Sequence, residues 1–152
     1  MTTLLDEFKA ITGALNEAGI EYAVCGGWAM AIHGLPRATM DIDLLVLAGD
    51  LEKIWGIAQT LGYEVEGRPL HFDIEIRRIS KIDRVSKNLT TLNLLLVGEG
   101  IRDVWEDRRS VEWDEGSTSV VSVDGLVKMK LMAGRKRDLE DIEKLREASN
   151  ES

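Results

Sequence analysis

Two aspartates separated by a single residue open an apolar segment of the chain, Asp41-Ile42-Asp43-Leu44. In a β-strand, residues two apart point to the same face, so this spacing would present Asp41 and Asp43 as a pair of carboxylates. Carboxylates this close repel one another when partly buried, and Mg²⁺ relieves such repulsion while also binding water and substrate phosphates. The pair therefore predicts a site for a hard cation that orients a triphosphate for phosphoryl displacement. A solvated pair at a strand edge, without a ligand, is the simpler alternative.

Two glycines, Gly26 and Gly27, follow a short apolar segment at 20–25 and precede a predicted helix that starts near Trp28. Glycine leaves room where phosphate must approach the backbone, and the N–H groups at the start of a helix attract anions. The 13 residues at 28–40 are enough for one helix and a return loop, so the glycine turn would lie beside Asp41. For the glycines considered alone, a tight turn with no ligand is the alternative.

Hydrophobic periodicity predicts the elements that must position these residues. Apolar residues three and four apart indicate helices, whereas short apolar runs or strict alternation indicate strands. The predicted helices lie at about 4–18, 28–33, 51–61, 126–133 and 138–148, and the predicted strands at 20–25, 41–47, 71–79 and 92–97, with weaker strand candidates at 113 and 120–123. Helices thus bracket a mixed sheet, which is an α/β or α+β arrangement. From the length of 152 residues we expect a single domain, 1–152, that includes a C-terminal helical segment at about 124–148.

Composition excludes several classes of protein. Nineteen Lys and Arg against 27 Asp and Glu give a net charge of −8, which argues against a protein that coats duplex nucleic acid or an anionic membrane. One cysteine and two histidines exclude a disulfide framework and a cysteine-based zinc site, so a metal would have oxygen ligands. Neither an export signal nor a membrane span is readable, and we expect a cytoplasmic protein.

The glycine pair and the Asp41-Ile42-Asp43-Leu44 segment together resemble the signature of the DNA polymerase beta nucleotidyltransferase superfamily. That signature is a Gly-Gly or Gly-Ser turn, a helix, and then Asp-hydrophobic-Asp-hydrophobic. Before the aspartates, Arg37-Ala38-Thr39-Met40 resembles the AbiEii-like proteins, which include toxins of toxin–antitoxin systems, while 26–29 also resembles small antibiotic nucleotidyltransferases. The segment 126–142 resembles the lysine-containing helix and the Arg-x-x-Asp-Leu-x-Asp-Ile stretch that close such domains.

The resemblance implies a nucleotidyltransferase fold, in which a twisted mixed β-sheet is flanked by α-helices. It also implies transfer of a nucleoside monophosphate from a nucleoside triphosphate (NTP) to an acceptor, which could be RNA, a protein or a small molecule. Carried over by position, Asp41 and Asp43 would hold Mg²⁺, and Gly26 and Gly27 would face the triphosphate. A role in a toxin–antitoxin pair, with a protein partner, is a further implication.

Three more residues are candidates for phosphate or base contacts by the same resemblance: Arg37, Thr39 and Lys130. Arginine offers a planar fork of donors for phosphate, and lysine offers a point charge. The alternative for Arg37 is a charge on a surface loop. Lys130 belongs to a basic stretch at 128–137, which could contact RNA or could be a solvated helix face that complements the helix dipole.

The predicted strand at 92–97 departs from the family at a position that matters for activity. Active members carry a third carboxylate on a neighbouring strand, and Asn93 stands at the equivalent position. We keep Asn93 with Asp41 and Asp43 as the candidate catalytic residues, although an amide adds no negative charge and cannot act as a general base. Asp73 or Glu75 could supply the missing group. Two functions therefore stay open, an active Mg²⁺-dependent transferase and a catalytically weakened relative that binds nucleotide or a protein partner.

Overall fold

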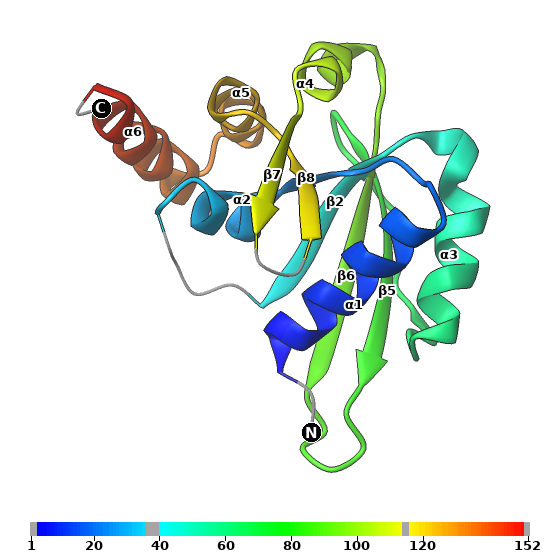
Figure 1. Cartoon of the computed structure of the whole chain (residues 1–152). Helices are drawn as coiled ribbons and strands as arrows, with labels where there is room; N and C mark the ends of the chain where they lie inside the picture. The colour runs from blue at the N-terminus through cyan, green and yellow to red at the C-terminus, as the bar shows by residue number, and fades with distance from the viewer. Residues whose placement is uncertain (1–2, 36–39, 114–115, 151–152) are drawn as a thin grey trace.

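The computed structural model describes residues 3–35, 40–113 and 116–150, and it shows a mixed, open β-sheet flanked by helices (Figure 1). Within these residues, eight strands form the sheet in the order β3-β5-β6-β2-β1-β8-β7, and β4 pairs with β5 beside this path. The strands are β1 (Ala23–Cys25), β2 (Asp41–Val46), β3 (Val65–Glu66), β4 (Leu70–His71), β5 (Glu75–Ile82), β6 (Leu89–Leu96), β7 (Arg109–Trp113) and β8 (Gly116–Val120).

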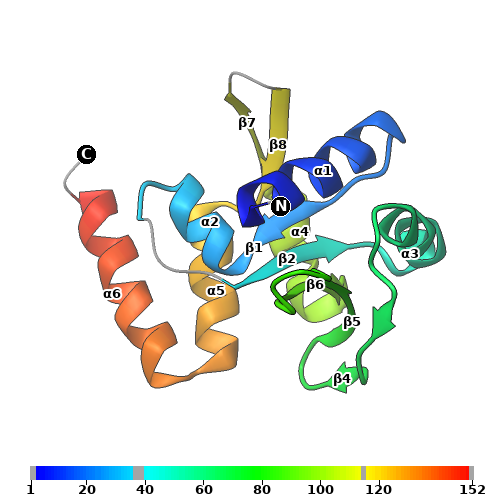
Figure 2. The same cartoon turned by 90° about the horizontal axis from the view of Figure 1, so that it is seen from below.

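The helices gather at two sides of this sheet. They are α1 (Leu4–Glu17), α2 (Gly26–Ile32), α3 (Leu51–Thr60), α4 (Arg102–Glu106), α5 (Val123–Ala133) and α6 (Lys136–Asn150), with short 3₁₀ turns at Ala48–Asp50 and Glu99–Ile101. Figures 1 and 2 both show α5 and α6 together near α2, with α3 at the opposite side of the molecule. Helix α1 packs beside α3, and α5 packs against both α4 and α6.

Local sequence signals fix where the helices begin and end. Thr3 caps α1 by accepting the Asp6 backbone N–H, and the Asp6 carboxylate accepts the Thr3 N–H in return, which completes a capping box. Ser122 caps α5 in a similar way by accepting the Gly125 N–H at 3.0 Å. Gly134 ends α5 in the left-handed conformation with φ of +64°, so the chain turns sharply into α6. The two C-terminal helices are therefore placed close to each other by their own end signals.

The four central strands bring distant parts of the chain into one row. Strand β2 pairs parallel with β6 and antiparallel with β1, and β6 pairs antiparallel with β5. In this register Cys25 lies opposite Asp43, Asp43 opposite Asn93, and Asn93 opposite Arg78. Each of these four strands is paired on both sides, so the register of the sheet fixes which residues stand in this row.

The two faces of the central strands differ in polarity. On one face Ile42, Leu44, Leu92 and Leu94 are fully buried in the hydrophobic core. The opposite face is polar at one end, where it carries Arg78, Ser80, Thr91, Asn93, Asp41 and Asp43. Because side chains alternate along a strand, the burial of Ile42 and Leu44 in the core fixes the direction in which the two carboxylates point.

The α+β fold class and its mixed sheet, flanked by helices, are confirmed, but one predicted strand is wrong. The alternation at 71–79 does not belong to a single strand: β4 ends at His71, the chain bends, and β5 begins at Glu75. His71 pairs antiparallel with Glu75, and Phe72 at the bend is 78% exposed. A tight reversal of the chain therefore interrupts a period of two that continues in the sequence across it.

None of the helices in the described residues is long and apolar enough to cross a membrane.

Candidate functional site

Asp41 and Asp43 point to the same side of β2, as their spacing predicts. Ile42 and Leu44 are fully buried on the other side, whereas both aspartates are half-buried. Asn93 on β6 lies between them and donates from Nδ2 to Asp43 Oδ1 at 2.8 Å and to Asp41 Oδ2 at 3.3 Å. The three candidate catalytic residues therefore form one hydrogen-bonded group at the polar end of the sheet.

A fourth residue, Arg78 on β5, completes this group. Its Nε donates to Asn93 Oδ1 at 3.1 Å. Arginine has donors only, so the atom of Asn93 that faces it must be the oxygen, and the amide nitrogen must face the carboxylates. Arg78 is not among the residues predicted from the sequence; its position opposite Asn93 depends on the register of β5 and β6, and the misplaced strand at 71–79 hid that register.

The electrostatics of Asp43 favour a bound cation. Burial raises the pKa of this carboxyl above its usual value, and the neighbouring Asp41 raises it further. The hydrogen bond from Asn93 and the positive charges of Arg135 and Lys130 act in the opposite direction, without cancelling the effect. An ionised Asp43 is thus incompletely compensated in the protein alone, and a divalent cation would supply the missing positive charge.

Gly26 lies directly against the Asp43 carboxylate. It begins α2 with φ of +66°, in the left-handed region that side chains disfavour. A Cβ atom built on Gly26 would overlap Asp43 Oδ2, so only glycine allows the turn and the carboxylate to approach this closely. Gly27 is the second residue of α2, and the glycine turn therefore lies beside the acidic pair, where the sequence spacing placed it.

We expect Gly26→Ala to displace the Asp43 carboxylate and to destabilise the protein. The left-handed backbone alone costs alanine about 1–2 kcal/mol. Gly19→Ala is a matched control, because Gly19 has φ of +70° but no atom lies within 4 Å of the place that its Cβ would occupy. Urea denaturation should show a lower free energy of unfolding for both variants, with the larger decrease for Gly26→Ala. Only Gly26→Ala should lose binding of divalent cation. Equal behaviour of the two variants would show that the contact with Asp43 is unimportant.

Lys130 lies in a buried ion cluster between α5 and α6. Its Nζ is 2.9 Å from Asp141 Oδ2 and 3.7 Å from Asp138 Oδ1, and all three residues are less than a tenth exposed. The expectation of a solvated helix face for Lys130 is therefore wrong, because the packing of α5 on α6 encloses its ammonium group. Its candidate role in nucleotide binding stays a prediction.

Arg135, between α5 and α6, is the exposed member of the same cluster. Its side chain is 62% exposed, and its Nε donates to Asp138 Oδ2 at 2.7 Å. Asp138 also accepts the Arg135 backbone N–H at 3.2 Å, which caps the start of α6. The positive charge of Arg135 acts to lower the pKa of Asp43, against the larger effect of burial, so this cation lies near enough to influence the carboxylate.

The other candidate residues are placed as follows. Arg37 and Thr39 lie outside the described residues. Asp73 lies in the exposed bend before β5, and Glu75 contacts His71 at 3.4 Å and Arg77 at 3.5 Å. Glu75 is three residues from Arg78 on one strand and so points to the opposite face. Glu75 is therefore not placed to replace the missing carboxylate, and for Asp73 the idea stays a prediction.

The residues present fit Mg²⁺ through Asp41 and Asp43 alone. Across the ranges that the structure describes, no group of three or more His, Cys, Asp or Glu side chains is arranged to hold a metal. Two carboxylates, water and substrate phosphates are nevertheless a common ligand set for Mg²⁺. The uncompensated charge at Asp43 supports such a set. Asn93 does not belong to it in this orientation, because its nitrogen faces the pair.

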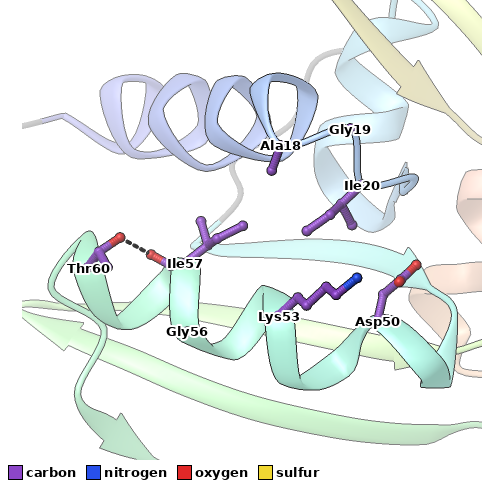
Figure 3. Close-up of a pocket in the computed structure, with 8 residues that line it drawn as sticks. All are labelled: Ala18, Gly19, Ile20, Asp50, Lys53, Gly56, Ile57 and Thr60. Carbon is purple, nitrogen blue, oxygen red and sulfur yellow. Dashed lines mark hydrogen bonds between the residues drawn. The ribbon is translucent and has the colours of Figure 1, made fainter.

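A surface hollow of about 450 Å³ lies elsewhere, between the end of α1 and α3 (Figure 3). Ile20, Lys53 and Ile57 are among its lining residues, which include none of the polar residues of β2, β5 and β6. The Thr60 hydroxyl inside it donates to the Ile57 carbonyl of its own helix at 2.6 Å. This hollow is therefore separate from the candidate site.

Several solved structures share this fold. A candidate nucleotidyltransferase of Thermotoga maritima, TM1012, aligns with a TM-score of 0.65 at 19% identity, over 97% of this chain and 93% of that one. The lincosamide antibiotic adenylyltransferase LnuA, with lincomycin bound, aligns with a TM-score of 0.60 at 13% identity, over 92% and 94%. ANT(2″)-Ia in complex with adenylyl-2″-tobramycin aligns with a TM-score of 0.58 at 17% identity, over 97% and 95%.

No protein-family model and no curated protein sequence matches the chain. At these low identities the structural likeness shows the fold, which is that of the nucleotidyltransferases.

Proposed function

We propose that this protein transfers a nucleoside monophosphate from an NTP to a hydroxyl group of an acceptor, with Mg²⁺ held by Asp41 and Asp43. The observation that carries the proposal is the pair of carboxylates, Asp43 at 2.8 Å and Asp41 at 3.3 Å from the Asn93 amide nitrogen, with Gly26 against Asp43, in a nucleotidyltransferase fold. In the reaction the acceptor oxygen forms a bond to the α-phosphorus, the bond to the β-phosphate breaks, pyrophosphate leaves, and the hydroxyl proton passes to solvent water.

Each residue of the site has a proposed task. Bound Mg²⁺ would offset the negative charge that develops on the phosphates. Asp41 and Asp43 hold the cation from a rigid central strand, so the triphosphate binds in a fixed position. Gly26 and Gly27 leave the space in which the triphosphate lies, and Arg37 and Thr39 contact phosphate or base. Asn93 cannot accept a proton from the acceptor, so its contribution is to hold the two carboxylates.

The basic group between α5 and α6 would act on the phosphates through Arg135. Because Lys130 is enclosed by Asp138 and Asp141, it acts chiefly by keeping these carboxylates in place, and Asp138 in turn positions Arg135. An exposed guanidinium can bind phosphate with two parallel hydrogen bonds. We therefore propose Arg135 as the phosphate contact of the C-terminal segment, with Lys130 as a supporting residue.

A small hydroxylated molecule is the acceptor that we favour. LnuA with lincomycin and ANT(2″)-Ia with adenylyl-2″-tobramycin both align over more than nine-tenths of each chain. The net charge of −8 makes RNA a less favourable acceptor. A protein acceptor, and an AbiEii-like role in a toxin–antitoxin pair, depend on the 37–40 motif, which lies largely outside the described residues.

The function is tested by binding and turnover measured on the same protein. Mg²⁺ with ATP, GTP, CTP or UTP should raise the melting temperature, because a ligand selective for the folded protein stabilises it by mass action. Pyrophosphate should then be released when small hydroxylated antibiotics, total RNA or protein are added, and labelled nucleotide should appear on one of these acceptors. Absence of any shift with every NTP would remove the proposal.

A second candidate, a weakened transferase that binds nucleotide without turnover, is favoured by one observation. Asn93 presents a donor where active members of the superfamily are expected to have a third carboxylate. This candidate predicts a melting shift with Mg²⁺-NTP but no pyrophosphate release by the wild type, together with a gain of activity in Asn93→Asp. Robust turnover by the wild type would exclude it.

A further inference from the structure

Four polar side chains on three neighbouring strands form a continuous chain of hydrogen bonds. Arg78 on β5 donates to Asn93 Oδ1 at 3.1 Å, and Asn93 on β6 donates to Asp43 and Asp41 on β2 at 2.8 Å and 3.3 Å. The register places Arg78, Asn93 and Asp43 directly opposite one another across the strands. The register of the three strands therefore holds these side chains next to one another.

The direction of the Asn93 amide in this chain is fixed by Arg78. An amide can present either oxygen or nitrogen, and the choice is decided by its partners. If the amide were reversed, its nitrogen would face the Arg78 N–H, and its oxygen would face two carboxylate oxygens. Three hydrogen bonds would thus be replaced by three repulsive contacts, so the reversed amide is strongly disfavoured while Arg78 is present.

We propose that Arg78 is a positioning residue that keeps Asn93 turned as a hydrogen-bond donor to Asp41 and Asp43, so that Asn93 is withheld as a metal ligand and the two carboxylates alone bind the divalent cation. This inference rests on the proposed function, since it concerns the cation of the same site. In the protein without metal, the amide donor compensates part of the repulsion between the carboxylates. The same donor, and the nearby guanidinium charge, weaken the attraction for a cation.

Removal of Arg78 should therefore tighten cation binding. In Arg78→Met the amide is free to reverse and to offer Oδ1 as a third oxygen ligand. Mn²⁺, a probe for the Mg²⁺ site, can be measured without nucleotide from the electron paramagnetic resonance signal of the free ion. We expect Arg78→Met to bind Mn²⁺ about tenfold more tightly than the wild type, the scale on which residues behind metal ligands act.

Two control variants distinguish an effect of the Asn93 amide on Mn²⁺ affinity from an effect of the lost arginine charge. Arg77→Met removes the same charge from the next residue, whose side chain lies on the opposite face and contacts Glu75, and its Mn²⁺ affinity should equal that of the wild type. Arg78→Met/Asn93→Ala removes the guanidinium together with the amide, and it should lose the gain in affinity. If this double variant binds as tightly as Arg78→Met, the effect is one of charge and the proposal is wrong.

A measurement on the wild type keeps the proposal testable should Arg78→Met fold poorly. The side-chain NH₂ signals of Asn93, assigned by their loss in Asn93→Ala, should exchange slowly with water because both protons are hydrogen-bonded. Fast exchange, as for a solvated amide, would overturn the proposal. Slow exchange together with tighter Mn²⁺ binding in Arg78→Met would support the role of Arg78 even if no NTP binds. Failure of the proposed function can therefore be distinguished from failure of this inference.

Discussion

Asp43→Asn should strongly reduce nucleotidyl transfer while leaving the protein at least as stable as the wild type at neutral pH. Loss of a ligand to the catalytic cation removes several kcal/mol of charge stabilisation, so we expect a fall in turnover of about a thousandfold. Stability should not fall, because burial raises the pKa of Asp43 and the ionised carboxylate is therefore unfavourable in the folded protein. Asn can still accept the hydrogen bond from Asn93 through its own amide oxygen.

The effect of Asp43→Asn on stability should depend on pH in a defined direction. A carboxyl whose pKa is raised by folding favours the folded state only at pH below its unfolded value, and this contribution is lost as the pH rises through the folded pKa. The free energy of unfolding of Asp43→Asn should therefore match or exceed that of the wild type at pH 7, and the difference should shrink in acid. Urea denaturation of both proteins at several pH values measures this difference in the free energy of unfolding.

Asp73→Asn is the matched control, because it makes the same chemical change at an exposed carboxylate in the bend before β5. Transfer by this variant should equal that of the wild type. If Asp73→Asn loses activity, Asp73 reaches the site after all. If Asp43→Asn retains both turnover and the Mg²⁺-NTP melting shift, the assignment of the metal to Asp41 and Asp43 fails.

The sequence allowed the acidic pair and its glycine turn to be predicted because both depend on local rules. Alternation along a strand decides that Asp41 and Asp43 share a face while Ile42 points to the core. A Gly-Gly pair between a strand and a helix marks a turn with positive φ, which Gly26 shows at +66°. Each of these features involves residues close in the sequence, so no knowledge of strand order was needed.

The hydrogen-bonded row could not be predicted because it depends on register between strands. Arg78 and Asn93 are 15 residues apart, and their pairing required the correct start of β5. The polar-apolar alternation continued through a reversal of the chain at 72–74, and this put the strand about four residues too early. The burial of Lys130 was missed for a similar reason, since the packing of α5 on α6 decides which face of each helix is exposed.

Lys130→Met should cause a large loss of stability, well above that expected for an exposed ion pair. The substitution leaves Asp141 and Asp138 buried without the ammonium group 2.9 Å and 3.7 Å away, and breaking a buried ion pair in this way costs about 3–5 kcal/mol. We expect the lower end, because Asp138 keeps its contact with Arg135. The free energy of unfolding in urea measures the loss.

Two further variants decide what Lys130 does. Lys128→Met on the same helix breaks an exposed pair with Asp103 at 2.8 Å and should cost less than about 1 kcal/mol, and an equal loss in both variants would contradict the buried cluster. Lys130→Met/Asp141→Leu removes both charges and should recover most of the stability, because apolar residues can replace a buried pair. If this double variant keeps its melting shift with Mg²⁺-NTP, Lys130 supports the fold and Arg135. If it folds but loses the shift, the Lys130 ammonium itself binds the nucleotide, and its enclosure by the two carboxylates must open when the triphosphate arrives.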